Sequence, residues 1–256
     1  MRLSVIVITR NESANISDCL LSLDFADEVL VLDNASTDGT AEIARRLGAQ
    51  VSVTQDWPGF GPQKNRVLGL AGGEWVLSID ADERVTPELR EEILASILHP
   101  GVVTCFSIPR SSWFCGRFMQ HSGWSPDYVD RLFRKGSARF SDDLVHERLV
   151  HEGSSQRLNH PLLHYSFRDF SDVLQKVDRY STASAAQAFV SGKRASVFTA
   201  VGHGLWAFVR TYILKVGFLD GSHGLALAIS TAEGSYYRYL KLWLMQEKIK
   251  YGSGSR

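Results

Sequence analysis

The sequence predicts an α/β protein with a mostly parallel central sheet, flanking helices and a helical C-terminal extension. Three observations support this fold class. Apolar runs of strand length alternate with helix-length segments over the first hundred residues. Two of these runs end directly in an aspartate, and from residue 167 onward the pattern is helical. The 256 residues are 44% hydrophobic and 22% charged, which is enough for one sizeable core and argues against disorder.

The first hundred residues contain four segments expected to be strands, separated by segments of helical character. The first is a continuous apolar run of the kind buried on both faces, the second is also expected to be buried, and the third is a short strand. The expected strands are 3–8, 28–33, 50–54 and 75–80. The expected helices are 14–23, 39–47, 65–70 and 87–98, the last of them opened by a proline in its first turn.

Residues 102–150 change in character. Strands are expected at 102–109 and 128–134 as antiparallel additions, and the aromatic, glycine-containing segment 113–124 is interpreted as a functional loop. Helices are expected at 168–191, 196–216 and 223–249. We therefore predict two domains, residues 1–166 and residues 167–256.

Three carboxylates fall where expected strands end. Asp33 closes the second strand, and Asp80-Ala81-Asp82 follows the fourth. Open α/β sheets bind ligands beyond the carboxyl ends of their strands. Carboxylates at i and i+2 on such a turn can approach one Mg²⁺ or Mn²⁺ ion, which can also bind phosphate. The alternative is a pair of solvated turn aspartates.

Several functional classes are disfavoured by what the sequence lacks. No G-x-G-x-x-G follows the first strand and there is no P-loop motif, which argues against a dinucleotide cofactor. The three cysteines include no C-x-x-C pair, which argues against a disulfide framework and a zinc site. A formal net charge of zero gives no reason to expect a nucleic-acid partner.

Four motifs occur in order: Ser4 to Glu12, Leu32 to Thr40, Gln63 to Arg66 and Leu77 to Glu83. Together they resemble the family 2 glycosyltransferases, which have the GT-A fold and mostly invert anomeric configuration. The resemblance implies that residues 1–100 bind the nucleotide-sugar and 101–166 the acceptor, with Mg²⁺ or Mn²⁺ as cofactor. The implied roles are the nucleotide pocket for Thr9, Arg10, Asn11 and Glu12, the base or ribose for Asp33, the base or diphosphate for Lys64 and Asn65, and metal and diphosphate for Asp80 and Asp82.

The rest of the chain resembles the bacterial lipopolysaccharide core glucosyltransferases, through residues 121–124, 131–134, 145–147, 164–166 and 217–221. This implies transfer of glucose from a UDP-sugar to a saccharide or lipid-linked acceptor of the lipopolysaccharide core or another envelope glycan. Two alternatives remain. A nucleotidyltransferase would carry a glycine-rich loop where this chain has Thr9 to Glu12. A non-catalytic membrane-associated module would have lost the carboxylates.

An inverting transfer needs a general base for the acceptor hydroxyl and stabilisation of the leaving diphosphate. The resemblance favours Glu147 as the base, with Asp143 second. Asp142 lies in the same cluster. Many family members have Glu-Asp here, whereas this chain has His146-Glu147. His146 could therefore be a metal ligand, an acceptor contact or a residue that orients Glu147.

The remaining polar candidates have simpler interpretations. Arg131 is a candidate helper for the leaving group, and a loop salt bridge is the alternative reading of the acidic cluster. His121 and His164 are expected to be hydrogen-bonded structural residues.

Charge divides the chain into an acidic front and a basic back. Residues 1–150 carry 15 Lys and Arg against 21 Asp and Glu, whereas residues 151–256 carry 13 against 7. A basic, aromatic C-terminal region suits an anionic membrane surface. The longest uncharged apolar stretch, Ala195 to Val209, is shorter than the roughly 20 residues of a membrane span. We expect a cytoplasmic protein at the cytosolic face of the inner membrane, in peripheral contact through residues 195–245. One alternative is that the C-terminal helices form a hairpin that packs on the catalytic core or in a dimer. The other is that the charge imbalance only reflects solvated faces.

Overall fold

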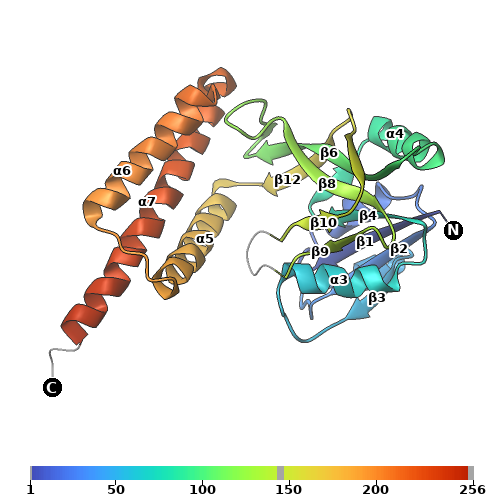
Figure 1. Cartoon of the computed structure of the whole chain (residues 1–256), viewed down its shortest axis with the longest axis horizontal. Helices are drawn as coiled ribbons and strands as arrows, with labels where there is room; N and C mark the ends of the chain where they lie inside the picture. Colours follow the sequence, from blue (N-terminus) through green and yellow to red (C-terminus); the bar gives the residue numbers. More distant parts are fainter. Residues whose placement is uncertain (1, 143–146, 253–256) are drawn as a thin grey trace. The chain divides into compact units, whose positions relative to one another are not determined.

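The computed structural model describes residues 2–142 and 147–252 and confirms the α/β class with a helical C-terminal region (Figure 1). The chain divides into two compact units. Unit 1 comprises Met1–Ser111 and Asp127–His164, and unit 2 comprises Ser112–Pro126 and Tyr165–Arg256.

Unit 1 contains a parallel core of four strands in the order β3-β2-β1-β4. Their bounds are Leu3–Thr9 for β1, Glu28–Asp33 for β2, Gln50–Val53 for β3 and Trp75–Asp80 for β4. The four strands match the expected ones within one residue at each end. β1 and β4 are buried along almost their whole length, as in strands covered on both faces, whereas β3 at the edge of the sheet is mostly exposed.

Antiparallel strands extend the sheet beyond β4, in the order β4-β8-β6-β12-β5. β6 and β8 are the two expected additions, whereas the other added strands have no recognisable sequence pattern because they are only two to six residues long. The bounds are Glu83–Val85 for β5, Val103–Phe114 for β6, Arg117–Phe118 for β7, Asp127–Arg134 for β8, Ser154–Arg157 for β11 and Leu162–Phe167 for β12. A separate two-stranded sheet pairs β9 (Ala138–Phe140) with β10 (Leu149–His151).

Four helices of unit 1 cover the sheet: α1 (Ile16–Leu21), α2 (Thr40–Arg46), α3 (Phe60–Leu70) and α4 (Pro87–Leu98). The Thr86 hydroxyl caps α4 by accepting a hydrogen bond from the Leu89 amide at 3.1 Å. Helix α3 begins at Phe60, five residues before the expected start, because the chain turns into it at Gly59 with φ of 119°. Lys64 therefore lies inside the helix.

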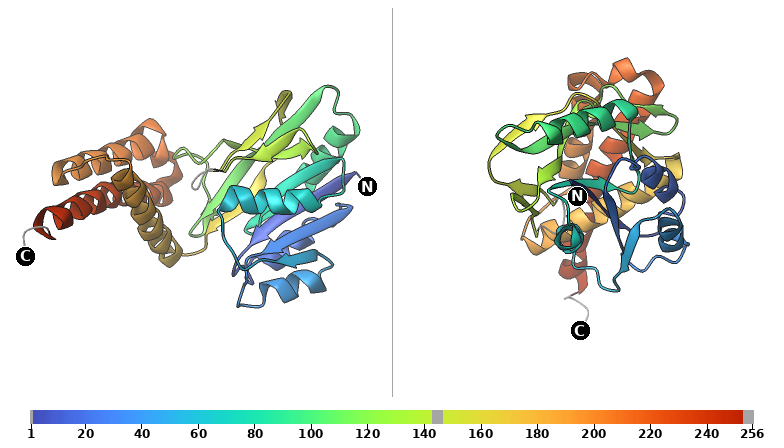
Figure 2. Two further views of the ribbon diagram at one scale, coloured as in Figure 1. Left: turned by 60° about the horizontal axis from the view of Figure 1, so that its bottom comes forward. Right: turned by 90° about the vertical axis from the view of Figure 1, so that its right-hand side faces the viewer.

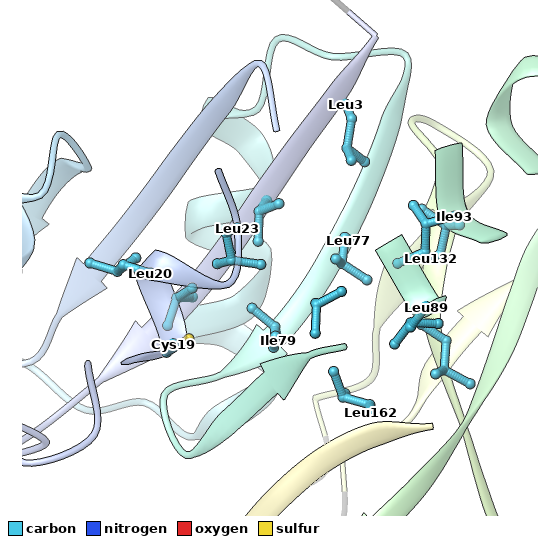
Figure 3. Packing of buried hydrophobic residues seen from close by; sticks show 14 of the residues in the cluster. Leu3, Cys19, Leu20, Leu23, Leu77, Ile79, Leu89, Ile93, Leu132 and Leu162 are labelled. Atoms are coloured by element: carbon cyan, nitrogen blue, oxygen red, sulfur yellow. The ribbon is translucent and has the colours of Figure 1, made fainter. Parts of the chain in front are cut away.

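The main hydrophobic core of unit 1 lies between the sheet and helices α1 and α4 (Figure 3). Leu77 and Ile79 of β4 meet Leu89 and Ile93 of α4 and Leu132 of β8 in this cluster. Each such side chain, fully buried, contributes about 1.5–3 kcal/mol of transfer free energy. A second cluster on the other face of the sheet includes Ile6, Val67, Ala71, Val76, Cys105, Phe133 and Phe140.

Unit 2 consists mainly of helices that pack along α7 (Figure 2). Their bounds are Phe170–Val190 for α5, Val197–Phe208 for α6 and Gly221–Gly252 for α7, with a π-helical segment at Val209–Leu214 and a 3₁₀ turn at Gly217–Asp220. The single helix expected at 196–216 therefore changes its hydrogen bonding after Phe208. The segment expected to be a loop at 113–124 contains the end of β6 and all of β7.

Candidate active site

The carboxyl ends of β1, β2 and β4 meet at one edge of the parallel sheet. Thr9 pairs in register with Asp33, and Ile8 pairs with Asp80. The buried Thr9 Oγ1 has no hydrogen-bond partner among the described residues. An unsatisfied buried polar group costs about 1–3 kcal/mol, so a ligand that satisfied this hydroxyl would recover that free energy.

The loops that follow β1 and β2 are joined by hydrogen bonds. Asn11 has a left-handed backbone with φ of 54°, and its Oδ1 accepts from the Thr37 amide at 2.9 Å. The Glu12 amide donates to Thr40 Oγ1 at 2.8 Å, and Arg10, which precedes Asn11, is exposed. The predicted nucleotide-pocket segment is therefore held in place at the sheet edge.

Asp33 is buried and takes part in this loop. It accepts hydrogen bonds from the Ser36 amide at 2.9 Å and the Ser36 hydroxyl at 2.5 Å. A carboxylate has about four acceptor positions, so Asp33 retains capacity for another donor. Its contact with a base or ribose remains a prediction.

Lys64 joins the sheet edge to the acidic segment after β9. Its side chain is almost fully buried, and its Nζ lies 3.2 Å from Asp80 Oδ1 and 2.9 Å from Glu147 Oε1. The three residues come from α3, β4 and the segment before β10. The structure thus brings together the predicted diphosphate contact, the predicted metal ligand and the favoured base.

Arg131 forms the second cationic partner of Asp80. Its Nη2 donates to Asp80 Oδ2 at 2.6 Å and to Glu83 Oε1 at 2.7 Å, and the Asp80 amide donates to Glu83 Oε2 at 2.8 Å. Removal of the Asp80 carboxylate from water would raise its pKa. The positive charges of Arg131 and Lys64 outweigh this effect and hold the pKa well below its usual value. Burial raises the pKa of Glu83; Arg131 opposes this shift and Asp80 adds to it.

The carboxylate of Asp82 lies next to a histidine. Its Oδ2 lies 3.4 Å from His164 Nε2, and His164 is held by the β12–β5 pairing opposite Glu83. Carboxylate and imidazole groups at this separation can both reach one divalent ion. His164, expected to be structural only, thus lies beside the predicted metal ligand.

Glu147 is half-buried, and Asp142 in the same acidic stretch is exposed. The other two candidates of that stretch, Asp143 and His146, lie outside the described residues. Gly61 of α3 sits against this stretch: a Cβ there would lie 3.5 Å from Glu147 Cβ and would overlap the Ser141 carbonyl oxygen. Glycine is therefore required for the close approach of α3 to this stretch.

Asn65 is hydrogen-bonded to the backbone of β9. Its Nδ2 donates to the Phe140 carbonyl and its Oδ1 accepts from the Phe140 amide, both at 2.9 Å. This pair of bonds fastens α3 to β9 and so positions the neighbouring Lys64. A nucleotide contact by Asn65 remains a prediction that these bonds do not support.

Glu83 was not among the predicted site residues. It was missed because a glutamate next to a strand end usually faces water. In the structure it is fully buried and forms an ion pair with Arg131, and the only signal in the sequence was its place directly after Asp-Ala-Asp.

Comparisons with known proteins identify the family. The model of the family described as glycosyl transferase family 2 matches residues 4–158. The chain belongs to glycosyl transferase family 2. An uncharacterized glycosyltransferase, RP128, of Rickettsia prowazekii is 30% identical over 94% of this chain and 86% of its own length. The lipopolysaccharide core biosynthesis glycosyltransferase LpsC of Rhizobium meliloti is 29% identical over 93% of each chain.

The solved structures show the fold. Residues 1–349 of S. aureus TarS in complex with UDP give a TM-score of 0.50 at 19% identity, over 98% of this chain and 92% of that one. The GT-A fold is confirmed, and the family decides against the nucleotidyltransferase alternative.

Proposed function

We propose that this glycosyltransferase moves glucose from UDP-glucose to a saccharide acceptor of the lipopolysaccharide core or a related envelope glycan, with inversion. Glu147 removes the proton from the acceptor hydroxyl, whose oxygen then attacks the anomeric carbon. The bond from that carbon to the diphosphate breaks, and the electron pair leaves with UDP. Lys64 stabilises the charge that develops on the diphosphate.

The observation that carries this proposal is the position of Lys64 Nζ between Asp80 at 3.2 Å and Glu147 at 2.9 Å. It puts a candidate base one side chain away from the strand end where the donor diphosphate is expected. A diphosphate would compete with both carboxylates for Lys64. Donor binding would therefore release Glu147 from its ion pair and leave it able to accept a proton.

The residues present also fit a divalent ion. Asp82 and His164 supply an oxygen and a nitrogen 3.4 Å apart, which suits Mn²⁺ better than the oxygen-preferring Mg²⁺. Both oxygens of Asp80 contact Lys64 or Arg131, so its predicted role as a direct ligand would require one of these pairs to open. When bound, the ion would neutralise charge on the leaving diphosphate.

Turnover of Glu147→Gln tests the assignment of the base. Donor binding, followed as the thermal shift caused by UDP-glucose with Mn²⁺, should stay close to that of the unaltered chain, whereas turnover should fall roughly 10²–10⁴-fold. Glu152→Gln is the matched control, because Glu152 is exposed in the turn after β10 and has no contact with Lys64 among the described residues. Turnover of Glu147→Gln equal to that of the control would exclude Glu147 and make Asp143 the next candidate.

Donor and acceptor can be identified together. LpsC, which aligns over nearly its full length, is named for lipopolysaccharide core biosynthesis, and this supports a core acceptor here. The test is a thermal-shift screen of UDP-sugars, followed by mass analysis of products formed on core oligosaccharides. A product heavier by one hexose supports the proposal, and Asp82→Ala should abolish it. Transfer of a different sugar would keep the family activity and reject glucose.

We further propose that the enzyme contacts an anionic membrane surface through α6 and the π-helical segment after it. Small buried residues, Ala200, Gly204 and Ala207, form the face of α6 toward α7, and a Cβ on Gly204 would lie 3.2 Å from Tyr236 Cβ. Most large apolar side chains of α6 and of the π-helical segment are exposed instead. They are Val197, Phe198, Val201, Leu205, Trp206, Val209, Ile213 and Leu214.

Charge favours a lipid surface with anionic headgroups. Lys193 and Arg194 precede this apolar face, and Arg210 and Lys215 lie at its other end, all exposed. Within the described residues, Val197–Leu214 is the one helical segment with the length and composition of a membrane span, and 22% of it is buried. A helix that exposes Trp, Phe and Leu and has Lys and Arg nearby has the composition of helices that lie in the membrane interface. The enzyme would then work at the cytosolic face of the inner membrane.

Vesicle cosedimentation tests this contact. The full chain should pellet with vesicles of phosphatidylcholine and phosphatidylglycerol and much less with phosphatidylcholine alone. The double substitution Leu205→Ser, Trp206→Ser should abolish pelleting, whereas Val190→Ser, an exposed apolar residue at the end of α5, should not. No binding to either vesicle, together with a dimer that the double substitution dissociates, would make this face a subunit interface and reject the membrane contact.

A further inference from the structure

Three side chains of different chemistry converge on unit 1 away from the residues assigned to transfer. Cys105, Asp130 and His151 each have a ligand atom within 4.8 Å of the other two. They come from β6, β8 and β10, and His151 Nε2 lies 3.8 Å from Asp130 Oδ2. Thiolate, carboxylate and imidazole are the three ligand types of protein zinc sites.

The sheet geometry explains why these groups meet. Cys105 and Ser107 lie two residues apart on β6 and so face the same side. A β-bulge at this point pairs Ser107 with Asp130, and Ser107 Oγ donates to Asp130 Oδ1 at 2.5 Å. His151 shares a face of β10 with Leu149, which packs against the cluster that contains Cys105.

The His151 ring also has an unsatisfied nitrogen, distinct from the Nε2 that lies near Asp130. His151 Nδ1 is buried and has no hydrogen-bond partner among the described residues. A neutral imidazole has one N–H and one lone pair, so this nitrogen lacks either an acceptor or a donor. Ser107 holds one oxygen of Asp130 and leaves the other facing His151. That arrangement resembles the outer hydrogen bonds that orient metal ligands.

We propose that Cys105, Asp130 and His151 bind a divalent ion of the zinc class. A thiol must lose its proton to become a metal ligand. Binding forms a sulfur–metal bond and releases that proton to solvent. Thiolate and carboxylate together then neutralise the ion. Ligand atoms around zinc are roughly 3–4 Å apart, so the three groups must close by about 1 Å.

The ion would fasten β10 to β6 and β8. His151 follows Glu147 by four residues, so the site would anchor the chain segment that carries the proposed base. Linear spacing could not reveal such a site, because its ligands come from three strands and no C-x-x-C motif is needed. The thiol separates this site from the Asp82–His164 pair, since soft ligands select zinc or cobalt and not magnesium.

Cobalt titration of the chelator-treated full chain, without any nucleotide-sugar, tests the site. One equivalent of Co²⁺ should produce thiolate-to-cobalt charge-transfer absorption that Zn²⁺ then removes, with release of one proton. Cys105→Ser should abolish the absorption, and His151→Gln should weaken Co²⁺ binding at least about tenfold. The same titration on Asp82→Asn should be unchanged.

Matched control variants show whether a loss of Co²⁺ binding comes from a missing ligand or from misfolding. Cys115→Ser and His160→Gln alter a second cysteine and a second histidine outside the cluster and should bind Co²⁺ like the unaltered chain. His151 is partly exposed, so His151→Gln decides the matter if Cys105→Ser does not fold. Absence of the charge-transfer absorption in the unaltered chain, or equal affinity in His151→Gln, would overturn the site and leave the proposed transfer reaction untouched.

Discussion

Helices α4 and α6 are both twelve residues long, but α4 buries its large apolar side chains and α6 exposes them. In unit 1, α4 buries Leu89, Ile93 and Ile97 against the sheet. In unit 2, α6 buries alanine and glycine while Phe198 is 88% exposed, Leu205 65% and Trp206 57%. The first helix completes its burial within the chain. The second leaves apolar surface for something else to cover, which is why we assign it to a membrane contact.

The largest expected effect is at the buried ion pairs of unit 1. Arg131→Leu leaves Asp80 and Glu83 without their shared cation, and stability should fall by about 3–5 kcal/mol in urea unfolding. The pKa of Asp80 is lowered by folding, so its contribution is present above the unfolded pKa of about 4 and lost below it. The difference between variant and parent should therefore shrink as the pH falls below about 4. A difference independent of pH would contradict the role given to Asp80.

Ile93→Ala tests how much the buried face of α4 contributes to stability. Ile93 is fully buried between α4 and the sheet, and its truncation should cost about 2–5 kcal/mol. Thermal or urea unfolding measures this loss, and Co²⁺ binding should be unchanged in the folded variant. A loss below about 1 kcal/mol would mean that the core around α4 repacks readily.

Gly61→Ala should have an intermediate effect on α3. Its new Cβ would overlap the Ser141 carbonyl, so the helix or the Glu147 segment must move, at a cost of about 1–3 kcal/mol. Turnover should fall with stability because Lys64 and Glu147 would separate. Gly69→Ala on the same helix is the matched control, since nothing lies within 4 Å of its Cβ, and it should stabilise by up to about 1 kcal/mol. Equal behaviour of the two variants would contradict the close approach.

The smallest effect on stability is expected at Phe198. Phe198→Ser removes an exposed side chain, and the free energy of unfolding in vesicle-free buffer should change by no more than about 0.5 kcal/mol. Binding to anionic vesicles should nevertheless fall. A large loss of stability would show that Phe198 is covered within the protein, and the contrast between α4 and α6 would no longer hold.

Much of unit 1 could be predicted because its signals are local. The runs 3–8, 28–33 and 75–80 are apolar throughout, and Pro87 marks the start of α4. The short strands escaped prediction because β9 and β10 have three residues each, too few for a period to show. Helix α3 was placed too late because the turn at Gly59, rather than its composition, determines where it begins.

The sequence by itself determined the fold class, the aspartates at the strand ends and the family, because strand periodicity and short motifs depend only on neighbouring residues. Tertiary structure decided which side chains meet. It brought Lys64 to Asp80 and Glu147, Asp82 to His164, and Asn65 to the backbone of β9. Contacts between residues so far apart in the chain depend on strand order, register and burial, and these are properties of the packed chain as a whole.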